Sequence, residues 1–81
     1  MWFVYIILCE DGSLYTGVSN NLEKRFLDHK NGKGGRYTRA HKPFKIIYSK
    51  KLPNQSEALK RERQIKDWSR GEKIRILNLD I

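Results

Sequence analysis

The 81-residue chain contains 17 lysine and arginine residues against nine aspartate and glutamate residues, which gives a formal net charge of +8. A chain of this size buries only about 60% of its unfolded surface, so it has room for one core and excludes a multidomain enzyme. Nine aromatic residues and a hydrophobic fraction of 38% exclude a disordered basic tail. We therefore expect one basic domain that spans residues 1–81.

The longest apolar segment, residues 1–9, is about half the ~20 residues that a membrane span needs, and no basic segment precedes it. We expect neither a membrane anchor nor a signal peptide, and no membrane partner. The single cysteine, Cys9, cannot form an intrachain disulfide, and with His29 and His41 it matches no zinc-site spacing. These features predict a cytoplasmic protein without a structural metal.

Positive charge is concentrated in the middle third of the chain. Residues 24–51 contain ten basic residues and one acidic residue, whereas residues 1–23 contain no basic residue. Aromatic side chains lie among these basic ones, and this mixture is typical of a surface that binds polyphosphate. We therefore expect a nucleic-acid partner; an acidic protein, membrane lipid or a merely solvated face are the alternatives.

The first two expected elements form a β-hairpin. Residues 2–8 are a continuous series of β-branched, aromatic and aliphatic residues, which predicts a central strand buried on both faces. The Asp11-Gly12 pair favours a tight turn, and residues 14–18 predict the returning antiparallel strand. Gly17 inside this strand marks a bulge or a position where another group closely approaches the backbone.

Three helices are predicted by a capping residue followed three positions later by glutamate. The first helix ends before Gly32, the second follows Pro53 and extends to about Trp68, and the third closes the chain. The three capping pairs are Asn20 with Glu23, Asn54 with Glu57, and Ser69 with Glu72.

A third strand is predicted over residues 44–48, between the first two helices. The loop before it, residues 32–39, is glycine-rich and basic but lacks the Gly-Lys-Ser/Thr ending of a P-loop, so we expect no ATP or GTP binding. The order β-β-α-β-α-α predicts an α/β (α+β) domain with a small three-stranded, mostly antiparallel sheet flanked by helices.

Several polar residues lie where apolar ones are expected. In the first helix His29 shares a face with two apolar residues, and Arg25 lies at the edge of that face. In the second helix Glu62 falls inside the apolar stripe, so it either pairs with a basic side chain, is protonated or binds a cation. Helix geometry leaves a structural ion pair and a functional carboxylate equally open. The apolar stripe of the second helix comprises Ala58, Leu59, Ile65 and Trp68, and the two apolar residues of the first helix are Leu22 and Phe26.

The spacing of two tyrosines, an arginine and a glutamate resembles that of a known family. Val4-Tyr5-Ile6 is followed about ten residues later by Tyr15-Thr16-Gly17, then by Arg25, and by Glu62 in a helical segment. This pattern resembles the GIY-YIG endonuclease family over nearly the whole chain, and above all its small stand-alone members. It is similar to the N-terminal nuclease domain of the nucleotide-excision-repair incision subunit. Where some members have a lysine, this chain has Val18.

The resemblance implies hydrolysis of nucleic-acid phosphodiesters with one divalent cation, Mg²⁺ or Mn²⁺, held by Glu62. It implies that Tyr15, with Tyr5 beside it, deprotonates the attacking water and that Arg25 holds the scissile phosphate. His29 would orient Tyr15 or the water. Forming tyrosinate at pH 7 costs about 4 kcal/mol unless nearby cations lower the pKa of the phenol.

The same resemblance implies structure-directed or weakly specific cutting, in DNA repair or nucleic-acid processing, with DNA expected over RNA and a protein partner for targeting. The alternative is a DNA- or RNA-binding module that keeps the nuclease fold but does not cut. Asn78 is a further candidate near the metal. The candidate nucleic-acid-binding residues are Lys33, Arg36, Tyr37, Arg39 and Lys42.

A shared site requires both tyrosines to lie on one face of the sheet. Neighbouring strand residues point to opposite faces, so the pairing register decides this. A two-residue loop of Asp11 and Gly12 would pair Leu8 with Tyr15 and place Tyr5 on the other face. We therefore predict an odd-numbered connection or a bulge.

Overall fold

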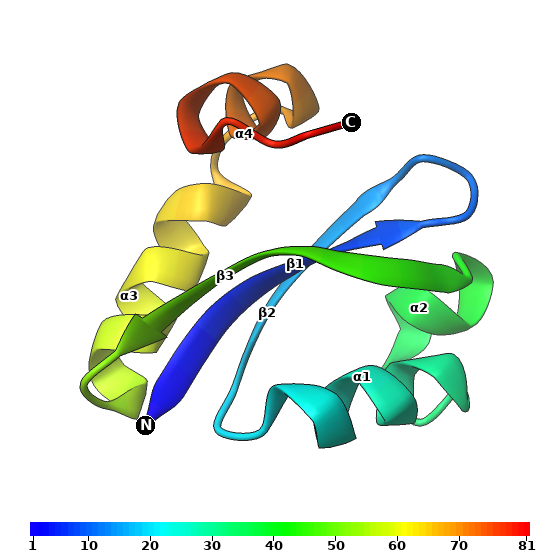
Figure 1. Ribbon diagram of the computed structural model, residues 1–81, viewed down its shortest axis with the longest axis horizontal. Coiled ribbons are helices and arrows are strands. Elements are labelled where there is room, and N and C mark those ends of the chain that lie inside the picture. The colour runs from blue at the N-terminus through cyan, green and yellow to red at the C-terminus, as the bar shows by residue number, and fades with distance from the viewer.

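The computed structural model describes residues 1–81 as a three-stranded sheet with four helices (Figure 1). The sheet is antiparallel with strand order β2-β1-β3, so β1 is the central strand. The α/β class and the small antiparallel sheet are as predicted. No helix is both long and apolar enough to cross a membrane. The elements are β1 (Trp2–Cys9), β2 (Leu14–Ser19), α1 (Leu22–Lys30), α2 (Arg36–Ala40), β3 (Pro43–Leu52), α3 (Gln55–Lys66) and α4 (Arg70–Leu77).

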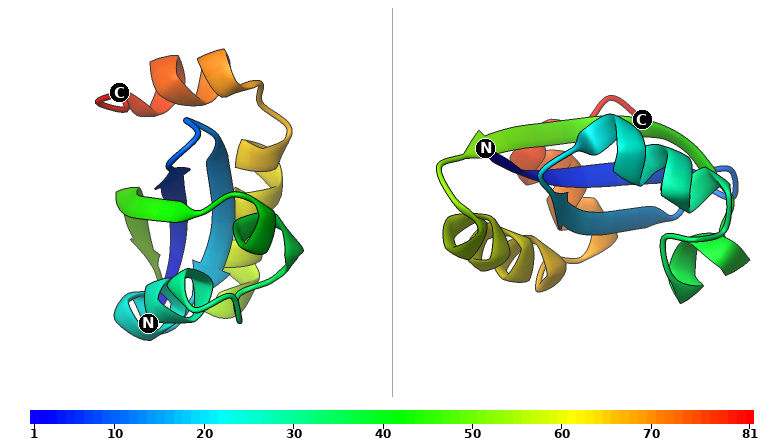
Figure 2. Two further views of the ribbon diagram at one scale, coloured as in Figure 1. Left: turned by 90° about the vertical axis from the view of Figure 1, so that its right-hand side faces the viewer. Right: turned by 90° about the horizontal axis from the view of Figure 1, so that it is seen from below.

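The apolar sequence of β1 forms the centre of the core on both faces of the sheet, which confirms the prediction for this strand. One face packs against α3 and α4 and the other against α1 (Figure 2). Burying each large apolar side chain stabilises the fold by about 1.5–3 kcal/mol. The buried residues are Val4, Ile6, Ile65 and Leu79 on the first face, and Tyr5, Ile7 and Cys9 on the second.

The β1–β2 hairpin has a three-residue turn, residues 10–12. The Cys9 amide donates to the Ser13 carbonyl (2.9 Å), and Gly12 has a φ of 86°, a conformation that glycine adopts without strain. In this register Tyr5 lies opposite Gly17, and Tyr15 lies two pairs along on the same face. The predicted odd-numbered connection is confirmed.

Two of the three predicted helix caps are confirmed and one is displaced. The side chains of Asn54 and Ser69 accept hydrogen bonds from the amides three residues later, and Ser69 forms a full capping box. The cap of α1 is Asn21, not Asn20, because the Asn21 side chain accepts from the Lys24 amide (3.1 Å). Helix α3 ends at Lys66, slightly before the predicted end.

Two features of the segment after α1 differ from the prediction. The predicted loop of residues 32–39 contains the start of α2, a five-residue helix. This helix was not predicted, because glycines precede it and no side chain caps its first turn. Strand β3 is ten residues long, and its pairing with β1 shifts twice, leaving Phe44 and Ile47 as the extra residues of two bulges. The longer strand reaches from α2 to α3 and so spans the whole sheet (Figure 1).

Candidate active site

Two tyrosines and a histidine form a cluster on the α1 face of the sheet. The ring centroids of Tyr5 and Tyr15 lie 6.4 Å apart, and the Tyr15 and His29 centroids lie 4.9 Å apart. Tyr5 and Tyr15 come from adjacent strands, and His29 reaches them from the last turn of α1. The structure therefore brings together three of the residues selected from the sequence.

Gly17 leaves the space that the rings of Tyr5 and Tyr15 occupy. A Cβ atom at this position would lie 2.6 Å from the Tyr5 hydroxyl and 3.0 Å from Cε2 of Tyr15. Both distances are shorter than ordinary van der Waals contact, so any side chain here would displace one or both rings. The close approach predicted at Gly17 is thus made by the two tyrosines themselves.

His29 is almost fully buried and uses both ring nitrogens. Its Nε2 lies 3.0 Å from the Tyr5 hydroxyl and its Nδ1 lies 2.6 Å from the Thr38 hydroxyl. Burial, with the nearby Arg25 charge, lowers the pKa of His29 to about 4, so the ring is neutral at pH 7. Its hydrogen-bond partners are Tyr5 and Thr38, whereas the resemblance implied that it orients Tyr15 or the water.

Two residues of this arrangement were missed in the sequence. Thr38 lies on α2 and bonds His29, and Gly34 leaves room for the His29 ring, which a Cβ at this position would overlap. The Gly34 carbonyl also accepts a hydrogen bond from Nη2 of Arg25 (3.1 Å). No local signal marks either residue, because their roles depend on how the loop folds back over α1.

Tyr5 is the more deeply buried of the two tyrosines. Burial raises the pKa of Tyr5 to about 12; Tyr15 and the Glu62 carboxylate also raise it, whereas Arg25 lowers it. Tyr5 therefore stays protonated at neutral pH. The influence of Glu62 indicates that α3 brings this carboxylate within electrostatic range of the cluster, although α3 covers the other face of the sheet.

The cluster continues outward from Tyr15 as a row of rings. Tyr37 of α2 lies 5.7 Å from Tyr15, and His41 stacks on Tyr37 with centroids 4.3 Å apart. Nδ1 of His41 lies 2.5 Å from Oδ2 of Asp11, a contact that joins α2 to the hairpin turn. Tyr15 is thus the link between the buried pair and the surface.

Glu62 lies on α3 between the buried residues Ala58 and Ile65, with its side chain 18% exposed. Its Oε2 is 3.2 Å from the ammonium of Lys66, which is half exposed. One ion pair therefore accounts for part of the charge, and no group of three or more His, Cys, Asp or Glu side chains gathers around it as a metal cluster. Leu59, expected in the apolar stripe, is instead exposed.

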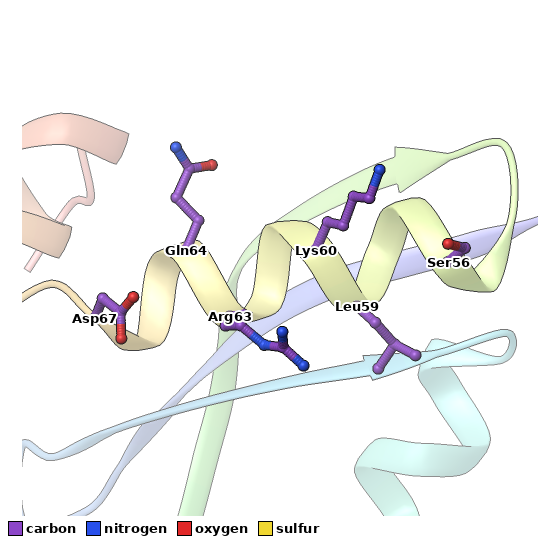
Figure 3. A pocket seen from close by; sticks show the side chains of 6 residues that line it. All are labelled: Ser56, Leu59, Lys60, Arg63, Gln64 and Asp67. Atoms are coloured by element: carbon purple, nitrogen blue, oxygen red, sulfur yellow. The ribbon is translucent and has the colours of Figure 1, made fainter.

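The outer face of α3 has a separate open hollow of about 590 Å³ (Figure 3). Its lining is mostly polar and includes two basic side chains, and it lies on the side of the helix away from Ala58 and Ile65. The hollow is therefore distinct from the tyrosine cluster. It is lined by Ser56, Leu59, Lys60, Arg63, Gln64 and Asp67.

The predicted basic residues lie at the α2 end of the molecule, on exposed positions in α2 and on either side of it. Asn78 is not brought to the cluster. It caps α4 with a φ of 54°, exposed beside the core residue Leu79, which packs on the other face of the sheet. The basic residues are Lys33, Arg36, Arg39 and Lys42.

Proteins of similar sequence align with almost the whole chain. UPF0213 protein OB0043 of Oceanobacillus iheyensis is 49% identical over 75 residues, which are 93% of this chain and 87% of that protein. UPF0213 protein SSP2268 of Staphylococcus saprophyticus is 43% identical over 76 residues, which are 94% of this chain and 93% of that protein.

A solved structure and a family model also match nearly the whole chain. The solution NMR structure of UPF0213 protein BH0048 from Bacillus halodurans superposes with a TM-score of 0.61 at 37% identity, covering 96% of this chain and 84% of that one. The model of the GIY-YIG catalytic domain matches residues 1–75. The chain therefore belongs to the GIY-YIG catalytic domain family.

Proposed function

We propose that this protein is a divalent-metal-dependent endonuclease that hydrolyses nucleic-acid phosphodiesters. The observation that carries the proposal is the convergence of Tyr5, Tyr15 and His29 above Gly17, with Arg25 and Glu62 in electrostatic range of the Tyr5 hydroxyl. Such a set offers a proton acceptor, a phosphate-binding cation and a carboxylate in one part of the molecule. Membership of the GIY-YIG catalytic domain family supports the same activity.

Tyr15 is the proposed general base. It is half-buried, and its hydroxyl has no hydrogen-bond partner within the protein, so a substrate water can reach it. Tyr5 is the proposed positioning residue, because its high pKa keeps it protonated and His29 fixes its hydroxyl. Arg25 would hold the scissile phosphate and stabilise the charge that develops on it.

Glu62 fits a divalent cation as a single carboxylate ligand. It is mostly buried, and its one ion-pair partner, Lys66, is a surface side chain that can turn away. Mg²⁺ is commonly bound by one or two carboxylates together with substrate phosphates and water. When bound, such a cation would supply positive charge at the phosphate.

A binding module that does not cut is the second candidate. The ion pair between Glu62 and Lys66 favours it, because a paired carboxylate is less available to a cation. In that case the basic residues around α2 would hold nucleic acid while Tyr15 and Glu62 serve only the fold.

A cleavage screen separates the two candidates. Duplex, branched, flapped and single-stranded DNA and RNA are incubated with Mg²⁺ or Mn²⁺, and the wild type is compared with Tyr15→Phe and Glu62→Gln. One matched control is Tyr48→Phe, on the other face of the sheet. The other is Glu57→Gln, because the native Glu57 also pairs with a lysine, Lys60, on the same helix. We expect cutting by the wild type and both controls, and loss of cutting in the two site variants. Binding without cutting by the wild type on every substrate favours the second candidate.

A further inference from the structure

A second candidate site surrounds Phe44, at the start of β3. Leu8 lies opposite Lys45 and Cys9 lies opposite Pro43, so Phe44 is the extra residue of a β-bulge. A bulge redirects the side chain of the strand that carries it. Here it leaves the Phe44 ring 58% exposed and outside both core clusters.

Phe44 forms one wall of a shallow pocket of about 450 Å³, a size within the range of about 300–1,000 Å³ for small-ligand sites. The other lining residues are Leu8, Cys9, Glu10 and Gly12, at the end of β1 and in the hairpin turn. This Phe44 pocket therefore combines an apolar floor with one exposed aromatic face.

The charged groups around the Phe44 pocket are of two kinds. The Lys45 ammonium lies 5.6 Å from the centre of the Phe44 ring, and Lys42 precedes β3 on an exposed position. Glu10, exposed on the other side, takes part in none of the salt bridges of the protein. The pocket thus offers two cations and one free carboxylate acceptor beside a ring.

A series of contacts connects the Phe44 pocket to the proposed active site. The Glu10 amide donates to the Lys42 carbonyl (2.8 Å), and Asp11 in the same turn contacts His41 at the end of α2. His41 in turn stacks on Tyr37, which contacts Tyr15. A strand bound along the basic residues of α2 would therefore pass from Tyr15 to Phe44.

We propose that the Phe44 pocket binds an unpaired nucleobase of the substrate strand, an inference that rests on the proposed function. The base stacks on Phe44, as bases stack on aromatic side chains in proteins that bind single strands. Lys42 and Lys45 neutralise the flanking phosphates. Glu10 accepts a hydrogen bond from an exocyclic amino group, which cytosine, adenine and guanine have and thymine and uracil lack. The substrate is therefore one with an unpaired, amino-bearing base near the cut, rather than a fully paired duplex.

The test measures binding in EDTA, so that cleavage does not interfere. Three DNA duplexes are compared: one blunt, one with a cytosine overhang and one with a thymine overhang. A fourth carries 2-aminopurine in the overhang, because its fluorescence falls when the base stacks. The variants are Phe44→Ala and Glu10→Gln, and Ile76→Ala on α4 is the control for loss of an exposed apolar side chain.

We expect Phe44→Ala to weaken binding of the cytosine overhang about 5- to 100-fold, to leave blunt-duplex binding unchanged and to abolish the 2-aminopurine quench. The wild type should prefer cytosine to thymine about 3-fold or more, and Glu10→Gln should remove this preference. Equal binding of all overhangs by wild type and Phe44→Ala would overturn the inference while leaving the nuclease proposal intact. Failure of the wild type to bind any of the duplexes would also overturn the inference, whereas the nuclease proposal is decided separately by the cleavage screen with Mg²⁺ or Mn²⁺.

Discussion

The Tyr5 hydroxyl and Nε2 of His29 lie 3.0 Å apart, so the central strand and the first helix are joined by a buried hydrogen bond. The bond needs a hydrogen on either the hydroxyl or Nε2. Because burial raises the pKa of Tyr5 and lowers that of His29, the protonated hydroxyl can donate to the neutral imidazole. Nδ1 of His29 forms a second hydrogen bond, with the hydroxyl of Thr38, which connects α2 to the Tyr5–His29 pair.

The first prediction concerns the titration of His29. In NMR titrations its ring signals should report a pKa near 4, against about 6.5 for an unperturbed histidine. The unfolded chain then binds a proton at higher pH than the folded chain does. The free energy of unfolding should therefore fall by up to about 3 kcal/mol as the pH drops from 6.5 to 4, and not above 6.5.

The control for this prediction is the other histidine of the chain. His41→Gln should keep the decline between pH 6.5 and 4, whereas His29→Gln should remove it. A ring pKa of about 6.5 for His29 would contradict the burial of its neutral form.

The second prediction concerns Gly17. Gly17→Ala should lower the stability by about 1–3 kcal/mol, measured by urea unfolding, because its Cβ would lie 2.6 Å from the Tyr5 hydroxyl. Tyr5→Phe in the same chain should restore part of the loss, since it removes the closest atom. Gly71→Ala is the matched control: no atom lies within 4 Å of its Cβ, and it should stabilise α4 by up to about 1 kcal/mol. Equal effects at both glycines would show that crowding at Gly17 is unimportant.

The third prediction concerns Glu62. If Glu62 is a metal ligand whose ion pair with the half-exposed Lys66 adds little stability, Glu62→Gln should cost only about 0.3–0.5 kcal/mol, like Glu57→Gln on the same helix. Thermal melts should show that Mn²⁺ raises the Tm of the wild type and of Glu57→Gln but not that of Glu62→Gln. A loss of 3–5 kcal/mol without any effect of Mn²⁺ would assign Glu62 to a structural ion pair.

The fourth prediction concerns the basic surface around α2. If about four phosphates are contacted, the logarithm of the binding constant for duplex DNA should fall with the logarithm of the salt concentration with a slope of roughly −3 to −4. Arg36→Gln and Arg39→Gln should each reduce the slope by about 1, whereas Arg75→Gln on α4 should leave it unchanged. A flat slope would instead favour an acidic protein as the partner.

Local sequence signals predicted the elements whose causes are local. The caps at Asn54 and Ser69 were read correctly because the side chain bonds an amide only three residues away. The central place of β1 followed from its continuous apolar sequence. The hairpin register was not predicted from a local signal, because it followed from the family resemblance, which requires Tyr5 and Tyr15 on one face. Asn21 replaced Asn20 as a cap because two adjacent asparagines offer the same chemistry.

The features that were missed depend on contacts between distant segments. Thr38 and Gly34 join the site only because the loop after α1 folds back over His29. Leu59 was placed in the apolar stripe because a helical wheel gives relative positions but not the part of the surface that the sheet covers. Phe44 looked like an ordinary strand residue, since nothing in the sequence marks the bulge that exposes it.

The core has a consequence for how the chain folds. Val4, in the first strand, and Leu79, after the last helix, belong to the same buried cluster. Arg70 also donates to the Gly12 carbonyl, so the hairpin turn is fixed by a residue near the other end of the chain. Contacts between residues so far apart in the sequence require closing a long loop, which costs conformational entropy before the contact forms. A chain in which α4 has not yet packed against the sheet therefore leaves part of the apolar surface of β1 uncovered.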